Sequence, residues 1–519
     1  MIEGGALLLE KLEAYLSAHR YEDAFEVKKV RQVDTYVRTA AHPYMASQLS
    51  FNRRKSPDTY RIFCLGGSAA MGWPHPLALS YPSFLQQKLN YIAPYHNFEV
   101  INAAASTYSS HQVRKIFDEI LQYQPNLIIL YSGNNEFLHH YARQIDQSDL
   151  PLATGRLLMR GWKFITQRGF KTQDSVSFLL DRALGSDEQR KMTKAGQKKM
   201  LTAHRENMLY MQEQAKQTGV SLLFMTLPAN LRDWHPHASR LGLHNDSVSL
   251  KNWQQHYMDA KSAMQARKYH QAIIHFRKAL ALDSGHAALQ FELGKALLKN
   301  QQLVSAKPHF THAVSQDAYP LRALPAMNNY IRSLAEDSAT WLLDVEKVLA
   351  NRADDNLIGD QLLTDHVHPT VKTNEFIAES VLEILDQMGV IKLPDRTLPQ
   401  LAPERQAFLT PNYLRNLFLI YRVMHQFEKV RDLYYECSEL SKIDQSYVSL
   451  LEELESYLEV AGPFHALKEA RSLKLEDSLY TITQIQRIEE KYARANQQLL
   501  KDIFPAEFVQ LTVEAQVNQ

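Results

Sequence analysis

Short polar clusters along the chain contain the residue types that nucleophilic acyl transfer needs. Ser68 lies in "GGS", and Asp365 and His368 stand three positions apart in "TDHVHPT". A serine hydroxyl is a poor nucleophile at neutral pH until an imidazole accepts its proton, and a carboxylate fixes the tautomer of that imidazole. A serine in a Gly-rich turn also occurs in phosphate-binding loops and in ordinary strand–helix connections, so the neighbouring elements decide among these interpretations.

These clusters follow segments that have the pattern of buried strands. The apolar runs are "RIFCL" (61–65), "FEVINA" (98–103), "NLIILYS" (126–132) and "VSLLFMTL" (220–227). Helical patterns with apolar residues at three- and four-residue spacing separate the first three runs. Strands that alternate with helices predict a parallel sheet with helices on both faces. Polar clusters after such strands are expected at the carboxyl edge of the sheet, where open α/β folds place their sites.

The order of the clusters resembles that of the SGNH hydrolases, also called GDSL-like esterases and lipases. A serine in "GGS", a small residue in "INAAAS", G-x-N in "SGNNEF" and D-x-x-H in "TDHVHPT" occur in that order. The resemblance covers roughly 60–138, 220–235 and 338–388. It implies an α/β fold with a flavodoxin-like three-layer parallel sheet and a serine esterase or acyl-transfer enzyme that uses no cofactor and no metal.

The resemblance also implies roles for individual residues. Ser68 would be the nucleophile that forms an acyl-serine, His368 the general base and Asp365 the group that orients the imidazole. Asn135, together with the backbone N–H groups of Ser68 and Ala104, would form the oxyanion hole. Attack on an ester carbonyl places negative charge on oxygen, and fixed hydrogen-bond donors of this kind stabilise it.

The sequence departs from the family pattern at two positions. Gly67 replaces the acid that gives the GDS motif its name, and Ala104 replaces a glycine of the second cluster. An alanine still donates its backbone N–H where its conformation permits. These departures affect the expected substrates and leave the triad in place.

Other histidines offer alternative interpretations. His366 is the rival general base, but Asp365 directly beside it is expected to point elsewhere. A metal site built from His139, His140 and His366 is conceivable because imidazole is a common ligand. Adjacent histidines in a polar loop are more often solvated, so we expect no catalytic metal.

A narrower resemblance is to bacterial SGNH proteins that carry tetratricopeptide repeats. It rests on "YSGNNEF…HHY" and "LPANLRDW". It implies that substrate-binding residues include Gly133, Glu136, Asn230 and Arg232, with the guanidinium of Arg232 available to an anionic substrate group. The alternative for Arg232 is an ion pair with Asp233 or another acid.

A repeat occupies about 252–316. Ala272, Phe276 and Ala279 recur 34 residues later as Ala306, Phe310 and Ala313. This interval and the A-x3-F-x2-A pattern resemble the tetratricopeptide repeat, whose helix pairs stack on small residues. The pattern indicates a helical insertion within the α/β domain, which is followed by a separate all-helical C-terminal domain.

The resulting domain prediction has five segments. We expect a helical or extended N-terminal segment, a hydrolase domain in two parts, a repeat insertion between them and a C-terminal helical domain. Their boundaries are 1–50 for the first segment, 51–250 and 321–392 for the hydrolase parts, 251–320 for the repeats and 403–519 for the C-terminal domain.

Composition limits the class of protein and the kinds of partner that the sequence allows. The 519 residues include 58 Lys and Arg and 57 Asp and Glu, for a formal net charge of +1, so no long-range field favours nucleic acid. Cys64 and Cys437 lie far apart, which argues against a disulfide framework. No apolar run is long enough for a membrane span. The expected compartment is the cytoplasm by default, or an extracytoplasmic one if an anchor precedes "EGGALLLEKL", which is similar to the stretch that follows such anchors.

The sequence leaves three functions open. The first is an esterase, and the second is an O-acyltransferase or deacylase that acts on a glycan or a biosynthetic intermediate. The third is an inactive hydrolase domain whose repeats bind a protein partner. The long insertions favour a large or carrier-bound ester substrate over a free lipid, because α/β scaffolds acquire specificity in loops and insertions.

Overall fold

The computed structural model describes most of the chain, in two compact units. The described residues are 23–39, 45, 49–138, 191–243, 247–336, 340–395, 397–404, 407–423, 426–472 and 479–503. One unit contains the described parts of Met1–Thr172, Met192–Asn230 and Leu321–Pro403, and the other contains those of Gln173–Lys191, Leu231–Pro320 and Glu404–Gln519. His139, His140 and most of the insertion between the third and fourth predicted strands lie outside the described residues.

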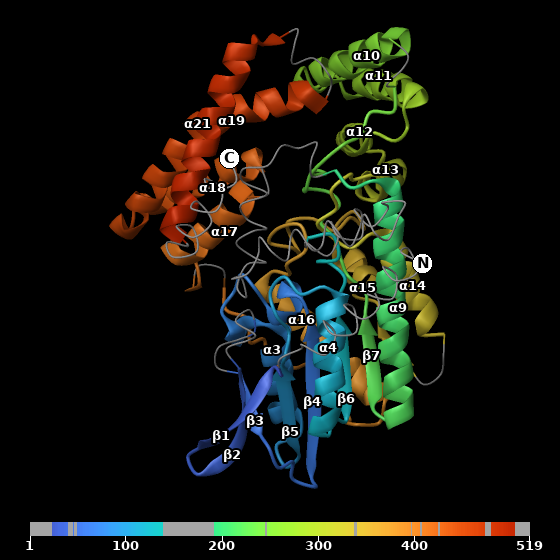
Figure 1. Ribbon diagram of the computed structural model, residues 1–519, viewed down its shortest axis with the longest axis vertical. Helices are drawn as coiled ribbons and strands as arrows, with labels where there is room; N and C mark the ends of the chain where they lie inside the picture. The colour runs from blue at the N-terminus through green and yellow to red at the C-terminus, as the bar shows by residue number, and fades with distance from the viewer. Residues whose placement is uncertain are drawn as a thin grey trace, which may run out of the picture. The chain divides into compact units, whose positions relative to one another are not determined.

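A five-stranded parallel sheet forms the centre of the first unit (Figure 1). The strands are β4 (Thr59–Gly66), β5 (Asn97–Asn102), β6 (Leu127–Tyr131), β7 (Ser221–Met225) and β8 (Thr340–Leu343). Their order in the sheet is β5-β4-β6-β7-β8, which is the 2-1-3-4-5 order of flavodoxin-like sheets. The predicted parallel α/β sheet is confirmed.

Burial on both faces explains why the central strands are continuous apolar runs. Phe63 of β4 pairs with Ile101 of β5 on one side and with Ile128 of β6 on the other. Every residue of β6 is buried. Strands of parallel sheets are covered by helices on both faces, so they carry apolar residues without alternation.

Helices cover both faces of this sheet (Figure 1). α3 packs on α16, and α4 packs on α9. Their bounds are α3 (Tyr81–Ile92), α4 (Ser110–Ile120), α9 (Lys194–Thr218) and α16 (Val371–Gln387), with short 3-10 turns η1 (Leu77–Leu79) and η2 (Leu121–Tyr123).

Side-chain caps fix where these helices begin. Ser80 accepts a hydrogen bond from the backbone N–H of Ser83 at the start of α3. Ser109 and Gln112 form a capping box at the start of α4. Thr370, the last residue of the TDHVHPT cluster, caps α16. Such caps satisfy N–H groups that have no acceptor within the helix.

A second, antiparallel sheet precedes β4 in the chain. It consists of β1 (Phe25–Val30), β2 (Val33–Arg38) and β3 (Ser50–Asn52). The carboxylate of Glu119, at the end of α4, accepts hydrogen bonds from the backbone N–H groups of Ala24 and Phe25 at 2.7 and 3.0 Å. The sequence analysis expected a helical or extended segment and did not identify this sheet.

Two helix pairs occupy the repeat region of the second unit. They are α10 (Ser247–Gln265) with α11 (Tyr269–Leu282), and α12 (Ala287–Lys299) with α13 (Leu303–Ser315). The six recurring Ala and Phe residues are all fully buried. A Cβ atom on Gly294 would lie 3.1 Å from the ring of Phe310, so a small residue is needed where α12 meets α13. Assignment to the tetratricopeptide repeat family stays a prediction.

The remaining described residues of the second unit are helical. The elements are α17 (Pro411–Val423), α18 (Phe427–Ser441), η4 (Gln445–Tyr447), α19 (Val448–Ser472) and α21 (Ile482–Ile503). Nowhere in the described ranges is there a helix both long and apolar enough to span a membrane.

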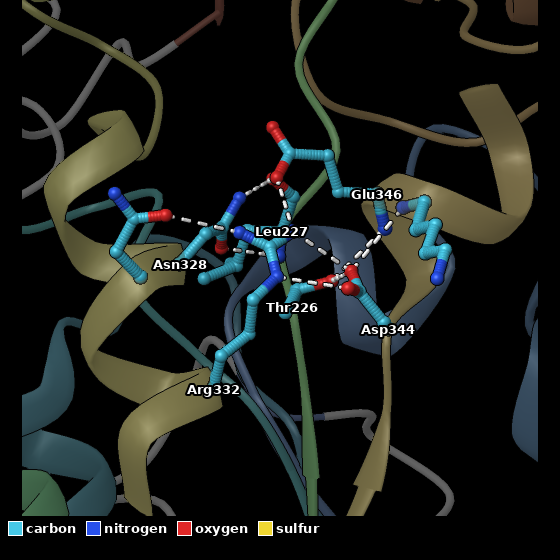
Figure 2. Close-up of polar contacts among 8 residues, drawn as sticks. Thr226, Leu227, Asn328, Arg332, Asp344 and Glu346 are labelled. Atoms are coloured by element: carbon cyan, nitrogen blue, oxygen red, sulfur yellow. Dashed lines mark hydrogen bonds and ion pairs between the residues drawn. The ribbon is translucent and has the colours of Figure 1, made fainter.

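A polar cluster attaches the chain to the sheet where it returns from the repeat region (Figure 2). Arg332 lies on α14 (Pro325–Leu334), and Asp344 lies between β8 and α15 (Val345–Arg352). The guanidinium donates to both carboxylate oxygens of Asp344, at 2.8 and 2.9 Å, and to Glu346 at 2.6 Å. Asp344 also accepts from the hydroxyl of Thr226, at the end of β7, at 2.8 Å.

Asn328 adds a second attachment one turn earlier on α14. Its side-chain oxygen accepts from the backbone N–H of Leu227, and its amide donates to the carbonyl of the same residue, both at 2.8 Å (Figure 2). Together with the Arg332 cluster, these bonds fix α14 against the carboxyl ends of β7 and β8.

We expect Arg332→Ala and Asp344→Ala to be non-additive. Bidentate pairing of partly buried groups contributes more than a single exposed ion pair, so the coupling free energy from a double-mutant cycle should be about 1 kcal/mol. The control cycle pairs Arg332→Ala with Glu346→Ala. Arg332 and Glu346 share a single hydrogen bond, so the coupling free energy of this cycle should be smaller. Denaturant unfolding measures both cycles, and additive effects for Arg332 and Asp344 would contradict the attachment.

Candidate active site

The turn after β4 presents Ser68 at the carboxyl edge of the sheet. Gly66 has φ of +155°, and a Cβ atom there would lie 2.1 Å from the backbone oxygen of Tyr131 on β6. Only glycine fits this conformation and this close approach. The chain then turns into the short helix α2 (Ser68–Met71), with Ser68 as its half-buried first residue.

Ser68, His368 and Asp365 form one continuous hydrogen-bonded chain. The hydroxyl Oγ of Ser68 lies 2.7 Å from Nε2 of His368, and Nδ1 of His368 lies 2.6 Å from Oδ2 of Asp365. With Asp365 as a carboxylate, Nδ1–H donates to it and Nε2 accepts from the Ser68 hydroxyl. Residues 300 positions apart in the sequence are therefore within direct proton-transfer distance.

Asp365 is held as a buried carboxylate. It is fully buried, and its Oδ1 accepts the backbone N–H groups of Val367 and His368, each at 2.9 Å. Burial, the largest influence, favours the protonated form, but electrostatic attraction to the imidazoles of His368 and His366 and the hydrogen bonds they form outweigh it and hold the pKa of Asp365 well below its usual range. An ionised Asp365 fixes the tautomer in which Nε2 of His368 is free of its proton.

His366 lies closer to Asp365 than the sequence analysis expected. Its Nδ1 is 3.3 Å from Oδ1 of Asp365, so the expectation that this carboxylate points elsewhere was wrong. Burial lowers the pKa of His366, which keeps the imidazole neutral near pH 7. Among the contacts of the described residues, it is Nε2 of His368 that reaches the hydroxyl of Ser68.

Two further aromatic side chains support the His368 loop, and the sequence analysis missed both. The ring of Trp73 meets the His368 ring edge-on, with centroids 4.9 Å apart. Nε2 of His75 lies 3.1 Å from the carbonyl of Pro369, and burial lowers the pKa of His75 to about 4, so its neutral ring is a donor to that carbonyl. Their position in "MGWPHP", directly after the Ser68 turn, was the available signal.

The side-chain amide of Asn135 lies beside the Ser68 turn. Its Nδ2 donates one hydrogen bond to the carbonyl of Tyr108 at 3.0 Å, which leaves its second N–H. A Cβ atom on Gly67 would lie 2.4 Å from Nδ2 of Asn135. The absence of a side chain at Gly67 therefore leaves room for this amide.

Ala104 lies in a loop that is held against the end of β4. The backbone N–H groups on either side of it, those of Ala103 and Ala105, donate to the carbonyls of Cys64 and Gly66 at 3.0 and 3.1 Å. The N–H of Ala104 itself has a longer contact, 3.4 Å, to the side-chain oxygen of Asn102.

Glu136 caps helix α4. Its two carboxylate oxygens accept the backbone N–H and the hydroxyl of Ser110 at 2.7 and 2.8 Å, and Asn207 on α9 donates to the same hydroxyl at 3.0 Å. Burial raises the pKa of Glu136 to about 7, although the bonds from Ser110 act in the opposite direction. These contacts hold the loop of Asn135 against the start of α4.

The remaining predicted substrate-binding residues have structural contacts. The amide of Asn230 donates to Asp360 at 2.8 Å and to the backbone carbonyl of Asp365 at 3.1 Å, which supports the loop of Asp365. Gly133, with φ of +149°, lies at the end of β6. In the second unit, Arg232 pairs with Asp233 at 3.0 Å, the alternative that the sequence left open.

Comparisons of the sequence and the structure with known proteins find only weak similarity. Neither a protein-family model nor a curated protein matches the chain. Among solved structures, the chain is similar to an acetylxylan esterase from Geobacillus stearothermophilus (11% identity, TM-score 0.30, 65% of this chain and 97% of the esterase). A GDSL-like lipase from Bacteroides thetaiotaomicron gives 10% identity and a TM-score of 0.29, over 66% of this chain and 93% of the lipase. Values this low decide neither family nor reaction, so a functional assignment depends on the site geometry.

We expect Gly67→Ala to reduce ester turnover without unfolding the protein. The new Cβ atom would displace the amide of Asn135, the oxyanion donor expected from the sequence, and loss of one such donor costs about 10²- to 10³-fold in kcat. Turnover of p-nitrophenyl acetate and thermal unfolding measure the two effects. Gly242→Ala is the control, because the nearest atom to its added Cβ would be 3.6 Å away. Unchanged turnover in folded Gly67→Ala would contradict the assigned position of Asn135.

Glu136 should make folding stability depend on pH. Its pKa of about 7 lies above the ordinary 4.5, so the folded state retains this proton to higher pH than the unfolded chain. The contribution of this proton to the free energy of unfolding is fully present below pH 4.5 and is lost as the pH rises to 7. The protein should therefore lose on the order of 3 kcal/mol of stability over this range relative to Glu136→Gln. Denaturant unfolding of both proteins from pH 4.5 to 8 measures the difference, and parallel stability curves would contradict it.

Proposed function

We propose that the chain is a serine hydrolase of the SGNH type, which cleaves or transfers an ester-linked acyl group through an acyl-serine. The observation that carries this proposal is the hydrogen-bonded chain from the Ser68 hydroxyl through His368 to a buried, ionised Asp365. A half-buried serine hydroxyl bound to an imidazole nitrogen has the geometry of an activated nucleophile.

The first chemical step follows from these distances. As Oγ of Ser68 attacks the carbonyl carbon of the ester, Nε2 of His368 accepts the hydroxyl proton across 2.7 Å. The imidazolium is stabilised by Asp365, whose carboxylate stays ionised. The same proton then passes from Nε2 to the oxygen of the leaving alcohol, and the acyl group remains on Ser68.

Three N–H groups form the proposed oxyanion hole. The backbone N–H of Ser68 has no acceptor within α2, since it is the first residue of that helix. Asn135 supplies its second amide N–H, and Ala104 contributes its backbone N–H when the oxyanion competes with the long contact to Asn102. Donors fixed before the reaction stabilise the developing charge with little reorganisation.

The second step needs only a deprotonated oxygen nucleophile. His368 accepts a proton from water or from an acceptor hydroxyl, which attacks the acyl carbon and releases Ser68. Water as the acceptor gives hydrolysis, and a bound alcohol or glycan hydroxyl gives transfer. The groups that bind beside the acyl-serine decide between these outcomes.

A pair of neighbouring histidines provides the test of this function. We expect His368→Gln to reduce kcat on p-nitrophenyl acetate on the order of 10³-fold or more, because it removes the base. His366→Gln should have a much smaller effect, although its ring is equally buried and also contacts Asp365. Ser68→Ala should abolish turnover through the acyl-serine.

Circular dichroism and thermal unfolding establish that each variant is folded. A folded His366→Gln that is more impaired than His368→Gln would show that the base is assigned wrongly. Full turnover by Ser68→Ala would exclude the acyl-serine route.

A further inference from the structure

A cluster of metal-ligating side chains lies between two helices of the second unit. His256 and Asp259 are on α10, and His275 is on α11. One ligand atom from each residue can be chosen so that all of them lie within 4.8 Å of one another. His256 and Asp259 are three residues apart and so share one face of α10, which packs against α11.

These side chains lie close together but form no hydrogen bonds with one another. Nδ1 of His275 lies 3.6 Å from Oδ2 of Asp259, which is too long for a hydrogen bond. The Nδ1 atoms of His256 and His275 are both buried without a hydrogen-bond partner. Buried polar atoms are normally paired, so two imidazole nitrogens without a hydrogen bond, beside one carboxylate, are available to bind a ligand.

The spacing fits a tetrahedral metal ion. Zinc binds imidazole nitrogen and carboxylate oxygen at about 2.0 to 2.2 Å, which places two ligand atoms about 3.4 Å apart. The 3.6 Å between Nδ1 of His275 and Oδ2 of Asp259 is close to that value. The other oxygen of Asp259 accepts a hydrogen bond from Gln255 at 2.8 Å, which orients the carboxylate as outer partners of metal ligands do.

We propose that His256, Asp259 and His275 bind a divalent zinc-like ion that joins α10 to α11. Two imidazoles and one carboxylate favour zinc and its neighbours over calcium or magnesium, which prefer oxygen ligands. The side chains of His275 and Asp259 remain 31% and 39% exposed, so an ion can enter and water can occupy the fourth position. The ion would cross-link the first helix pair and is independent of the proposed esterase chemistry.

Metal titration of the full chain without a histidine tag tests this site. Co²⁺ replaces Zn²⁺ as a visible probe, because tetrahedral Co²⁺ absorbs strongly, and competition with Zn²⁺ gives the affinity. We expect one equivalent bound at this cluster, and an affinity at least tenfold weaker in His256→Ala and His275→Ala. Gln255→Ala should weaken binding about tenfold through the orientation of Asp259.

Controls separate this site from other histidines. His270 is an exposed histidine on α11, the helix that also carries His275, and His270→Ala should bind the metal as the parent does. His368→Ala disrupts the other ligand-bearing group, formed by Asp365, His366 and His368, and should also leave this equivalent intact. His275→Cys should retain binding, since a thiolate is a zinc ligand.

The results that support the metal site differ from those that overturn it. Loss of the equivalent in folded His256→Ala and His275→Ala, with retention in His270→Ala, supports the site. The proposal is overturned if the parent binds no Co²⁺ or Zn²⁺, or if binding disappears only in His368→Ala. Zn²⁺-dependent slowing of hydrogen exchange in α10 and α11, absent from His275→Ala, provides a second readout.

Discussion

The contact between Asp365 and His368 is the interaction on which the proposed chemistry depends. A fully buried carboxylate is stable as an ion only if donors surround it, and the backbone N–H groups of Val367 and His368 and the imidazole supply them. The same bonds fix the tautomer and orientation of the imidazole. The sheet brings the loop that carries this pair to the turn after β4, so the fold converts two distant segments into one site.

Small residues at the carboxyl edge make this convergence possible. Gly66 allows β4 to turn against the backbone of Tyr131, and Gly67 leaves space for the amide of Asn135. In the order β5-β4-β6, chain connections leave β4 and β6 in opposite directions along the sheet, and open α/β folds bind their ligands at such a position. Ser68 follows β4 and Asn135 follows β6, so both stand at this position.

The sequence predicted those features of the fold and of the candidate site that local residue patterns determine. Continuous apolar runs identified β4, β5, β6 and β7, and the order of the polar clusters identified Ser68, Asn135 and His368 as neighbours at one edge. It could not predict contacts for which no motif or local pattern gives a signal. The cap that Glu136 forms on α4 and the clearance at Gly67 are long-range contacts with no local signal. The sheet before β4 was missed because β1 and β2 are largely exposed and so have no continuous run of buried apolar residues.

A covalent probe of the nucleophile tests the central claim most directly. A fluorophosphonate reacts with a serine whose proton a neighbouring base removes, and peptide mapping by mass spectrometry identifies the modified residue. The account predicts one adduct, on Ser68, in the folded protein and a strongly reduced rate of labelling in His368→Gln. Labelling at another serine, or none in folded protein, would contradict the assignment of Ser68 as the activated nucleophile.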